Sequence, residues 1–313
     1  MAGPGGQMHK GWRRHMRWAR EQSWRYLPSS PAWTSIPIEG DGMNLRASAS
    51  LFAPSTEFTG WKRGLILPDS QQTAGPVDVL GWPELTRFLL DAALQRDLDP
   101  ASACCQDLYS YTIDFFTPPD PRRYSGPKVE TLEVRTTSAG LALRLWLRAW
   151  KEESNDDLSE ELFDYTGLTP GPFRLRDAAI SLGGTSALDV EQFAVTVDNA
   201  PALGPNEAGR PAFIIAGPRS VRLDLVKLHS SDVLNAAVRE GTPLSFSAAF
   251  AHPAGHELAL ELPVLYAAEN AESAPPRTLA RSHAVLQATA DESGCDLVYE
   301  VTLAGATTTT TAF

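Results

Sequence analysis

Apolar and polar residues alternate with a period of two along much of the chain after residue 40. The clearest case is residues 126–150, GPKVETLEVRTTSAGLALRLWLRAW, where leucine and valine alternate with threonine, glutamate and arginine on both sides of a small-residue turn. A strand directs successive side chains to opposite faces, so this pattern is typical of strands with one face in a core. The stretch therefore predicts a hairpin of two half-buried strands.

The same alternation elsewhere predicts a mainly β protein. Two segments, 83–95 and 231–240, instead have apolar residues at helical spacing. Pro83 suits the first turn of the first helix, and Gly241 suits the end of the second. The predicted strands are 43–52, 64–67, 109–116, 128–135, 141–150, 173–182, 190–198, 212–216, 220–228, 244–250, 257–266, 281–288 and 296–303.

The order of these elements is similar in the two halves of the chain: strands, a helix, a strand and then hairpins. We therefore expect two tandem β-sandwich units, each made of two sheets with one helix on the flank. The expected boundaries are an N-terminal arm at 1–36, units at 37–182 and 183–304, and a threonine-rich tail at 305–313.

Charge is unevenly distributed over the 313 residues, whose formal net charge is −11. The first 26 residues hold six basic residues and one acidic residue, so a basic arm precedes an acidic body. An acidic body argues against wrapping a nucleic-acid backbone, which requires clustered lysine and arginine. No apolar run approaches the ~18 residues of a membrane span, and no apolar stretch typical of a signal peptide follows the basic residues. We expect no membrane insertion.

Motifs that carry catalysis or metal binding are not found in the sequence. The HPAGH stretch separates His252 from His256 by Pro253 and Gly255, which indicates a turn rather than a zinc-binding helix. The acidic run NDDLSEELFD at 155–164 lacks the glycine and ligand spacing of a calcium loop. Three cysteines, two of them adjacent, give no disulfide framework and favour a reducing compartment. The sequence predicts no enzymatic activity, no metal and no organic cofactor.

Two stretches resemble the tail tube proteins of long-tailed bacteriophages of the siphophage type. The first, residues 111–150, contains a strand, the YSGPKV entry at 124–129, a small-residue turn and a second amphipathic strand. The second, PFRLRDAAISLGGTSALDVEQFAVTVDNA, leads into a strand that carries Val190, Phe193 and Asn199. The resemblance extends over residues 43–303, and the basic arm and the threonine-rich tail depart from it.

The resemblance implies a structural protein of the virion, assembled in the host cytoplasm. Such subunits form stacked rings whose inner sheets join into one β-barrel around a channel for DNA, and their partners include the tape measure, terminator and distal tail proteins. The family's rings are generally sixfold, so a chain with two units predicts a homotrimeric ring with pseudo-sixfold symmetry. Hexamers of single units with large loops remain an alternative. A terminator, distal tail or baseplate hub protein on the same fold, and a carbohydrate-binding β-sandwich, are the competing functions.

Within that framework, the polar strand faces are expected to line the channel, where an acidic wall repels phosphate. The candidates are Thr131, Glu133, Arg135, Gln192, Thr196 and Asp198. The arm is expected to contact a neighbouring ring through an apolar stripe and cations, with packing on its own subunit as the alternative. Its candidates are Trp12, Arg13, Met16, Arg17 and Arg20. The ATTTTTAF stretch at 306–313 favours an extended strand that adds to a neighbour.

Overall fold

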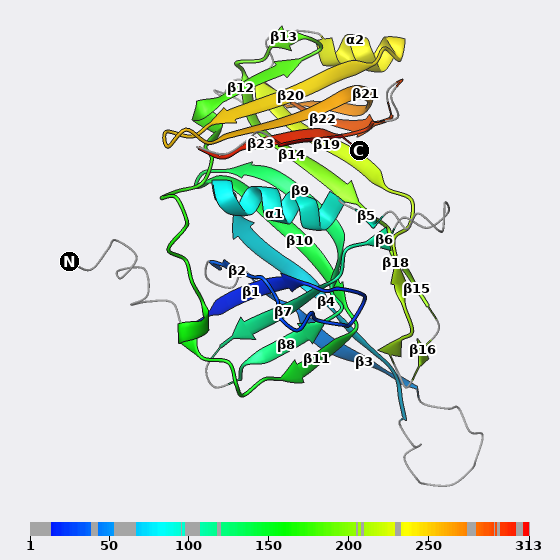
Figure 1. Ribbon diagram of the computed structural model, residues 1–313. Coiled ribbons are helices and arrows are strands. Elements are labelled where there is room, and N and C mark those ends of the chain that lie inside the picture. Colours follow the sequence, from blue (N-terminus) through cyan, green and yellow to red (C-terminus); the bar gives the residue numbers. More distant parts are fainter. Residues whose placement is uncertain are drawn as a thin grey trace, which may run out of the picture.

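The structure is a computed structural model that describes residues 14–38, 43–52, 67–94, 96–97, 107–117, 120–204, 206–207, 210–228, 233–273, 280–290, 292, 295–304 and 309–312. Strands dominate these residues and form one small and one large antiparallel sheet, with two helices, α1 (Pro83–Leu94) and α2 (Val233–Glu240) (Figure 1). No helix in the described part of the chain is long and apolar enough to cross a membrane.

The small sheet has five strands in the order β11-β8-β7-β1-β2. Two of them, β1 and β2, come from the segment that the sequence analysis assigned to a separate arm. Met16 and Trp18 of β1 are fully buried, which explains why this basic segment packs on its own chain. The strands are β1 (His15–Arg20), β2 (Trp33–Ile36), β7 (Tyr111–Phe116), β8 (Arg122–Ser125) and β11 (Lys151–Ser154).

The large sheet runs in the order β13-β12-β20-β21-β22-β19-β14-β9-β10-β4-β3, and β23 and β24 extend it from β21. All of its described pairings are antiparallel. Its strands are β3 (Arg46–Phe52), β4 (Leu67–Leu80), β9 (Lys128–Thr137), β10 (Gly140–Ala149), β12 (Ala178–Leu182), β13 (Thr185–Ser186), β14 (Val190–Asp198), β19 (Ser220–Leu228), β20 (Leu244–Ala251), β21 (Glu257–Ser273), β22 (Arg281–Ala288), β23 (Val298–Thr302) and β24 (Thr309–Ala312). Short two-residue strands pair beside it: β5 (Arg96–Asp97) with β6 (Asp107–Leu108), β15 (Ala202–Leu203) with β18 (Ile214–Ile215), and β16 (Asn206–Glu207) with β17 (Arg210–Pro211).

The long strand β21 divides the large sheet into two regions. Residues 257–261 pair with both β20 and β23, whereas residues 265–273 pair with β22. We call β13, β12, β20, the first part of β21, β23 and β24 the end region. The second part of β21 with β22, β19, β14, β9, β10, β4 and β3 is the long region. Figure 1 shows the end region at the top, with α1 over β9 and β10 below it.

Two sets of strands have the same connectivity. The small sheet has the order β11-β8-β7-β1-β2, and the end region has the corresponding order β23-β21-β20-β12-β13. In the long region, β9-β10-β4-β3 corresponds to β21-β22-β19-β14, and each helix follows the matching strand, β4 or β19. The described strands close no barrel within one chain; the long region ends at β3.

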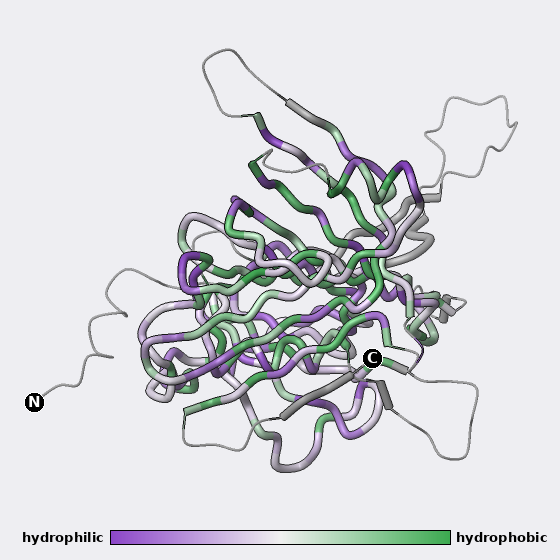
Figure 2. The backbone as a smooth tube through the Cα atoms, turned by 90° about the horizontal axis from the view of Figure 1, so that it is seen from above, coloured by the Kyte–Doolittle hydropathy of each residue, from purple (hydrophilic) through white to green (hydrophobic). Residues whose placement is uncertain are grey.

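The core lies between the apolar face of the long region and the elements that cover it. Leu132, Leu143, Val195 and Leu223 on four neighbouring strands are at most 1% exposed. Leu89 of α1 is also fully buried, and α1 contacts β9, β10 and β23. Figure 2 shows hydrophobic and hydrophilic segments alternating along the strands. The predicted mainly β architecture is therefore confirmed.

Several predicted strands differ in extent from the observed ones. The segment 173–182 begins as a loop and a short 3-10 turn, Leu175–Asp177, and only its end is strand β12. Most of the predicted strand 64–67 lies outside the described residues, whereas the observed β4 continues to Leu80. Gly75 and Pro76 obscured this strand in the sequence. The chain approaches closely there, because a Cβ on Gly75 would lie 2.1 Å from the Asn44 carbonyl oxygen.

Candidate functional surface on the large sheet

The six channel-lining candidates lie side by side on the two central strands of the long region. In β9 and β14, Thr131 is opposite Asp198, Glu133 is opposite Thr196, and Arg135 is opposite Ala194. Gln192 lies two residues before Ala194, on the same face. Their neighbours of opposite parity are buried, as expected. The structure thus brings all six candidates onto one face, which we call the polar face.

The polar face extends well beyond these two strands. One cross-strand row continues through β4, β10, β9, β14, β19, β22 and β21 without a change of face. In order, this row is Asp78, Arg144, Glu133, Thr196, Arg222, Gln287 and Tyr266. These side chains are half-buried or exposed. Their neighbours along each strand point to the opposite face and are apolar, and all of them except half-buried Ala267 are buried. The face is therefore a broad hydrophilic surface carried by seven strands.

The sequence analysis did not include several residues of the polar face among its candidates. Arg222 and Asp224 of β19 alternate with buried Leu223 and Leu225, so the same period-two pattern was available to find them. Asp78 was missed for a different reason. Its strand, β4, was not predicted beyond residue 67, so its face could not be assigned.

Ion pairs join neighbouring strands across the polar face. Asp78 Oδ1 lies 3.6 Å from Arg135 Nη2 and 3.7 Å from Arg144 Nε. Arg148 makes two-pronged contacts of 2.9 and 3.1 Å with the Glu130 carboxylate. Such contacts between partly exposed groups contribute little to folding, but they determine which charges the surface offers to a ligand.

The described candidates for an inter-ring contact lie in β1 of the small sheet. Met16 is fully buried, and Arg17 is enclosed by its own chain, where Asp114 accepts hydrogen bonds from Arg17 Nε and Nη2 at 3.0 and 2.8 Å. Both are therefore shielded from a neighbouring subunit in this conformation, which matches the alternative in which the segment packs on its own subunit. Arg20 is exposed and its guanidinium stacks on Tyr109, 3.3 Å from the ring centroid. Trp12 and Arg13 lie outside the described residues.

Asp114 is the centre of a buried charge network on the small sheet. It also accepts two hydrogen bonds from Arg123, at 2.7 and 2.9 Å, and the bond to Asp114 raises the Arg123 pKa. The acidic segment 155–164 lies over this network: Phe163 is buried, and the Arg17 guanidinium is 5.6 Å from its ring centroid. The carbonyl oxygen of Leu162 accepts a hydrogen bond from Arg17 at 3.4 Å. The segment is thus a cover for the small sheet.

The two histidines of the HPAGH turn have structural partners. His256 is buried, its Nε2 lies 2.9 Å from the Thr169 hydroxyl, and its Nδ1 accepts a hydrogen bond from the Ala304 N–H at 3.0 Å. The His252 Nδ1 accepts a hydrogen bond from the Ala254 N–H, which fixes the turn. Among the described residues, no group of histidine, cysteine and carboxylate side chains is arranged to hold a metal ion.

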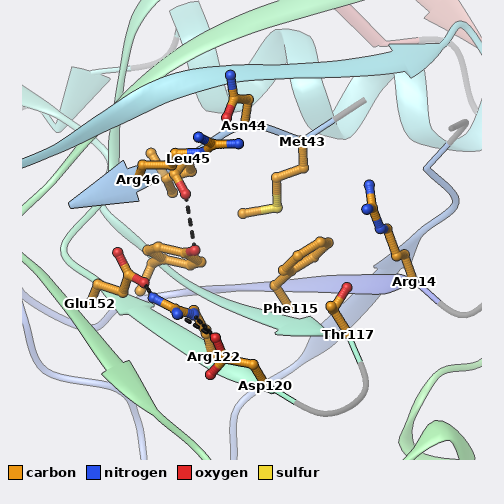
Figure 3. Close-up of a pocket in the computed structure, with 11 residues that line it drawn as sticks. Arg14, Met43, Asn44, Leu45, Arg46, Phe115, Thr117, Asp120, Arg122 and Glu152 are labelled. Carbon is orange, nitrogen blue, oxygen red and sulfur yellow. Dashed lines mark hydrogen bonds and ion pairs between the residues drawn. The ribbon is translucent and has the colours of Figure 1, made fainter. Parts of the chain in front are cut away.

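A cavity of about 640 Å³ opens between the start of β3 and strands β7 and β8 (Figure 3). Met43 and Phe115 form an apolar part of its wall, and Arg122 contacts both Asp120 and Glu152 at its rim. The Tyr124 hydroxyl donates a hydrogen bond to the Leu45 carbonyl oxygen at 3.1 Å, and burial raises the Tyr124 pKa to about 12. Among the charged groups that line the cavity, Asp120, Arg122 and Glu152 are occupied with one another.

A known protein family matches most of the chain. No curated protein matches the chain. The family model described as "Phage tail tube protein" matches residues 68–291, which include nearly all of the long region and both helices. This match covers well over half of the chain, and the family is structural and non-enzymatic. The chain therefore belongs to the phage tail tube protein family.

Proposed function

We propose that this chain polymerises as stacked rings into a hollow tube that conducts DNA from the capsid to the host, in a tail of the siphophage type. The observation that carries the proposal is the polar face, which spans seven strands while its opposite face is buried. A sheet of this kind supplies a continuous hydrophilic wall. Thr131, Glu133, Arg135, Gln192, Thr196 and Asp198 would face the lumen.

The proposal includes two tandem sandwich units, so that three chains make a ring with pseudo-sixfold symmetry. The matched connectivity of the two strand sets supports this duplication. It also favours different unit boundaries from those expected from the sequence. The first unit would begin at β1 rather than at residue 37, and the second would begin at β12 rather than at residue 183, because these strands occupy corresponding positions, each next to the edge strand of its set.

Ring closure would use a strand pairing that the chain already contains. Within one chain, β9 of the first unit pairs with β14 of the second. The corresponding strands at the two ends of the long region are β21 and β3, and β3 pairs only with β4 among the described strands. We infer that β21 of one chain pairs with β3 of the next. This arrangement gives each chain eight strands in the wall, four from each unit, and covers the strand edges.

Other tail proteins would meet this tube at defined places. The tape measure protein would occupy the lumen before DNA passage, and terminator and distal tail proteins would cap the two ends. Assembly in the host cytoplasm and incorporation into the virion follow from the same role. Residues 1–13, including Trp12 and Arg13, would reach a neighbouring ring. The threonine-rich tail was expected to add a strand to a neighbour, but its residues 309–312 form β24, which pairs with β23 of the same chain.

Electron microscopy of the purified protein tests the proposal. Long hollow tubes with a regular ring repeat are expected on concentration. Single capped rings would instead favour a terminator, distal tail or baseplate hub protein on the same fold. Monomers that form neither rings nor tubes, in the presence or absence of other tail proteins, would contradict a role in the tail wall.

A further inference from the structure

Five arginines of β9, β10, β19 and β22 project from the polar face, and each has a carboxylate beside it. Arg135 and Arg144 share Asp78, at 3.6 and 3.7 Å. On β19, Arg222 Nε donates a hydrogen bond to Asp224 at 2.9 Å. These contacts bring positive groups of the face into ion pairs within the plane of the sheet.

The other two arginines are paired through β-bulges. In β9, Thr131 is opposite Trp146 but Val129 is opposite Leu147, so Glu130 is an extra residue in its strand. A bulge of this kind can place two successive side chains on the same face. Glu130 accordingly reaches the polar face and binds Arg148, with Nε and Nη2 distances of 3.1 and 2.9 Å.

The bulge in β14 has the same consequence. Val190 is opposite Lys227 and Gln192 is opposite Val226, which leaves Glu191 as the extra residue. Glu191 accepts a hydrogen bond from Arg281 Nε at 2.5 Å. The contact with Arg281 lowers the Glu191 pKa and raises the Arg281 pKa, so the pair stays charged well below neutral pH.

These pairs are too exposed for folding stability to explain them. The exposed fractions of the arginine side chains range from 20% for Arg148 to 52% for Arg222, and pairs of this kind contribute little to the free energy of unfolding. A guanidinium at such a site would otherwise bind phosphate through two parallel hydrogen bonds. The ion pairs therefore lower the affinity of the polar face for phosphate groups.

We propose that Asp78, Glu130 and Glu191 neutralise four of these five arginines, and that the two bulges exist to supply two of these carboxylates. The four are Arg135, Arg144, Arg148 and Arg281. The partner that the arrangement excludes is a polyanion with the phosphate spacing of DNA. This inference rests on the proposed role of the polar face as the lumen wall. In this proposal, the three carboxylates keep the arginines from binding DNA phosphates, so that DNA passes through the lumen without adhering.

The test uses a full-length triple variant, Asp78→Asn, Glu130→Gln and Glu191→Gln, which preserves side-chain shape and removes three negative charges. Its matched control is Glu257→Gln, Glu261→Gln and Glu300→Gln on β21 and β23 of the end region, which changes the net charge equally. Binding of a short fluorescent DNA duplex is measured by anisotropy between about 50 and 200 mM salt, the range over which phosphate contacts change affinity strongly.

The triple variant is expected to bind DNA with a slope of log affinity against log salt of about −3 to −4. Four guanidinium groups lose a carboxylate, and of these Arg135 keeps Glu133 at 3.9 Å. Its affinity should fall on the order of 100-fold across the salt range. The wild-type chain and the control variant should show no measurable binding. Glu191→Gln alone, which releases only Arg281, should give a slope of log affinity against log salt of about −1. This single variant provides the test if the triple variant does not fold.

Two results would overturn the proposal. Equal DNA binding by the triple variant and its control would mean that net charge, not arginine release, governs the interaction. Absence of binding by the folded triple variant and by Glu191→Gln would mean that the arginines are inaccessible to DNA. Electron microscopy of the same wild-type sample keeps the proposed function separate, because a failure to form tubes contradicts that function whatever the DNA result.

Discussion

Replacing Asp114 by alanine should destabilise the folded chain more than any exposed substitution on the small sheet. The Asp114 side chain is completely buried and accepts four hydrogen bonds from Arg17 and Arg123, at distances from 2.7 to 3.0 Å. The substitution removes the acceptor but leaves both cations. Arg17 is the more costly of the two, because its side chain is only 10% exposed.

The expected loss in the free energy of unfolding is about 3–5 kcal/mol, the usual cost of leaving one partner of a buried ion pair without its counter-charge. Part of the loss will be recovered where Arg17 keeps its stacking on Trp33, 4.2 Å from the ring centroid. The exposed pair between Asp120 and Arg122 provides the comparison on the same sheet. Asp120→Ala should cost less than about 1 kcal/mol.

Urea unfolding followed by tryptophan fluorescence measures both changes, because Trp18 and Trp33 lie in the small sheet. The free energies of Asp114→Ala and Asp120→Ala are compared with that of the wild-type chain under the same conditions. A loss below about 1 kcal/mol for Asp114→Ala would refute the reasoning. It would imply that residues 15–20 do not occupy a buried strand beside Asp114 in solution.

Three further predictions follow from the same structure. Leu223→Ala in the core should cost about 2–5 kcal/mol in urea unfolding, whereas Arg222→Ala on the polar face should stay within about 0.5 kcal/mol; similar costs would mean that the strand parity is wrong. Ultraviolet titration should show Tyr124 ionising near pH 12, and Tyr124→Phe should remove that late step. Because burial raises this pKa, the stability due to neutral Tyr124 is complete below about pH 10 and is lost as pH rises towards the folded value; ionisation at the ordinary tyrosine pKa would contradict its burial. Deleting residues 1–13 should prevent tube growth and leave a folded monomer, whereas deleting 1–20 should also lower stability because β1 is lost; normal tubes from the shorter deletion would reject the inter-ring role.

Strands with one buried and one exposed face could be predicted from the sequence. For β14, β19 and β22 the predicted and observed bounds coincide, since each alternates leucine, valine, alanine or phenylalanine with polar residues. The candidate face could be predicted for the same reason. Parity alone places Glu133 and Thr196 on one side of their strands, and the pairing of β9 with β14 then brings them together.

Other features depend on partners that are distant in the sequence. The basic segment containing β1 was interpreted as an arm because the first 26 residues hold six basic residues and one acidic residue. Asp114, the partner of Arg17, lies 97 residues away in the sequence. The bulges at Glu130 and Glu191 could not be predicted from the sequence either. An extra residue in one strand is defined only by the register of its neighbour, so the pairing with β10 or β19 had to be known first.

The role of the polar face as a lumen wall is tested most directly by a cryo-electron microscopy cross-section of an assembled tube. The account predicts three chains per ring, eight strands of each chain in the wall, and the polar atoms of Glu133 and Thr196 nearer the tube axis than the buried side chains of Leu132 and Val197. A ring of six chains would reject the duplicated unit. A wall with the polar face turned outward, or the absence of a hollow tube, would contradict the account.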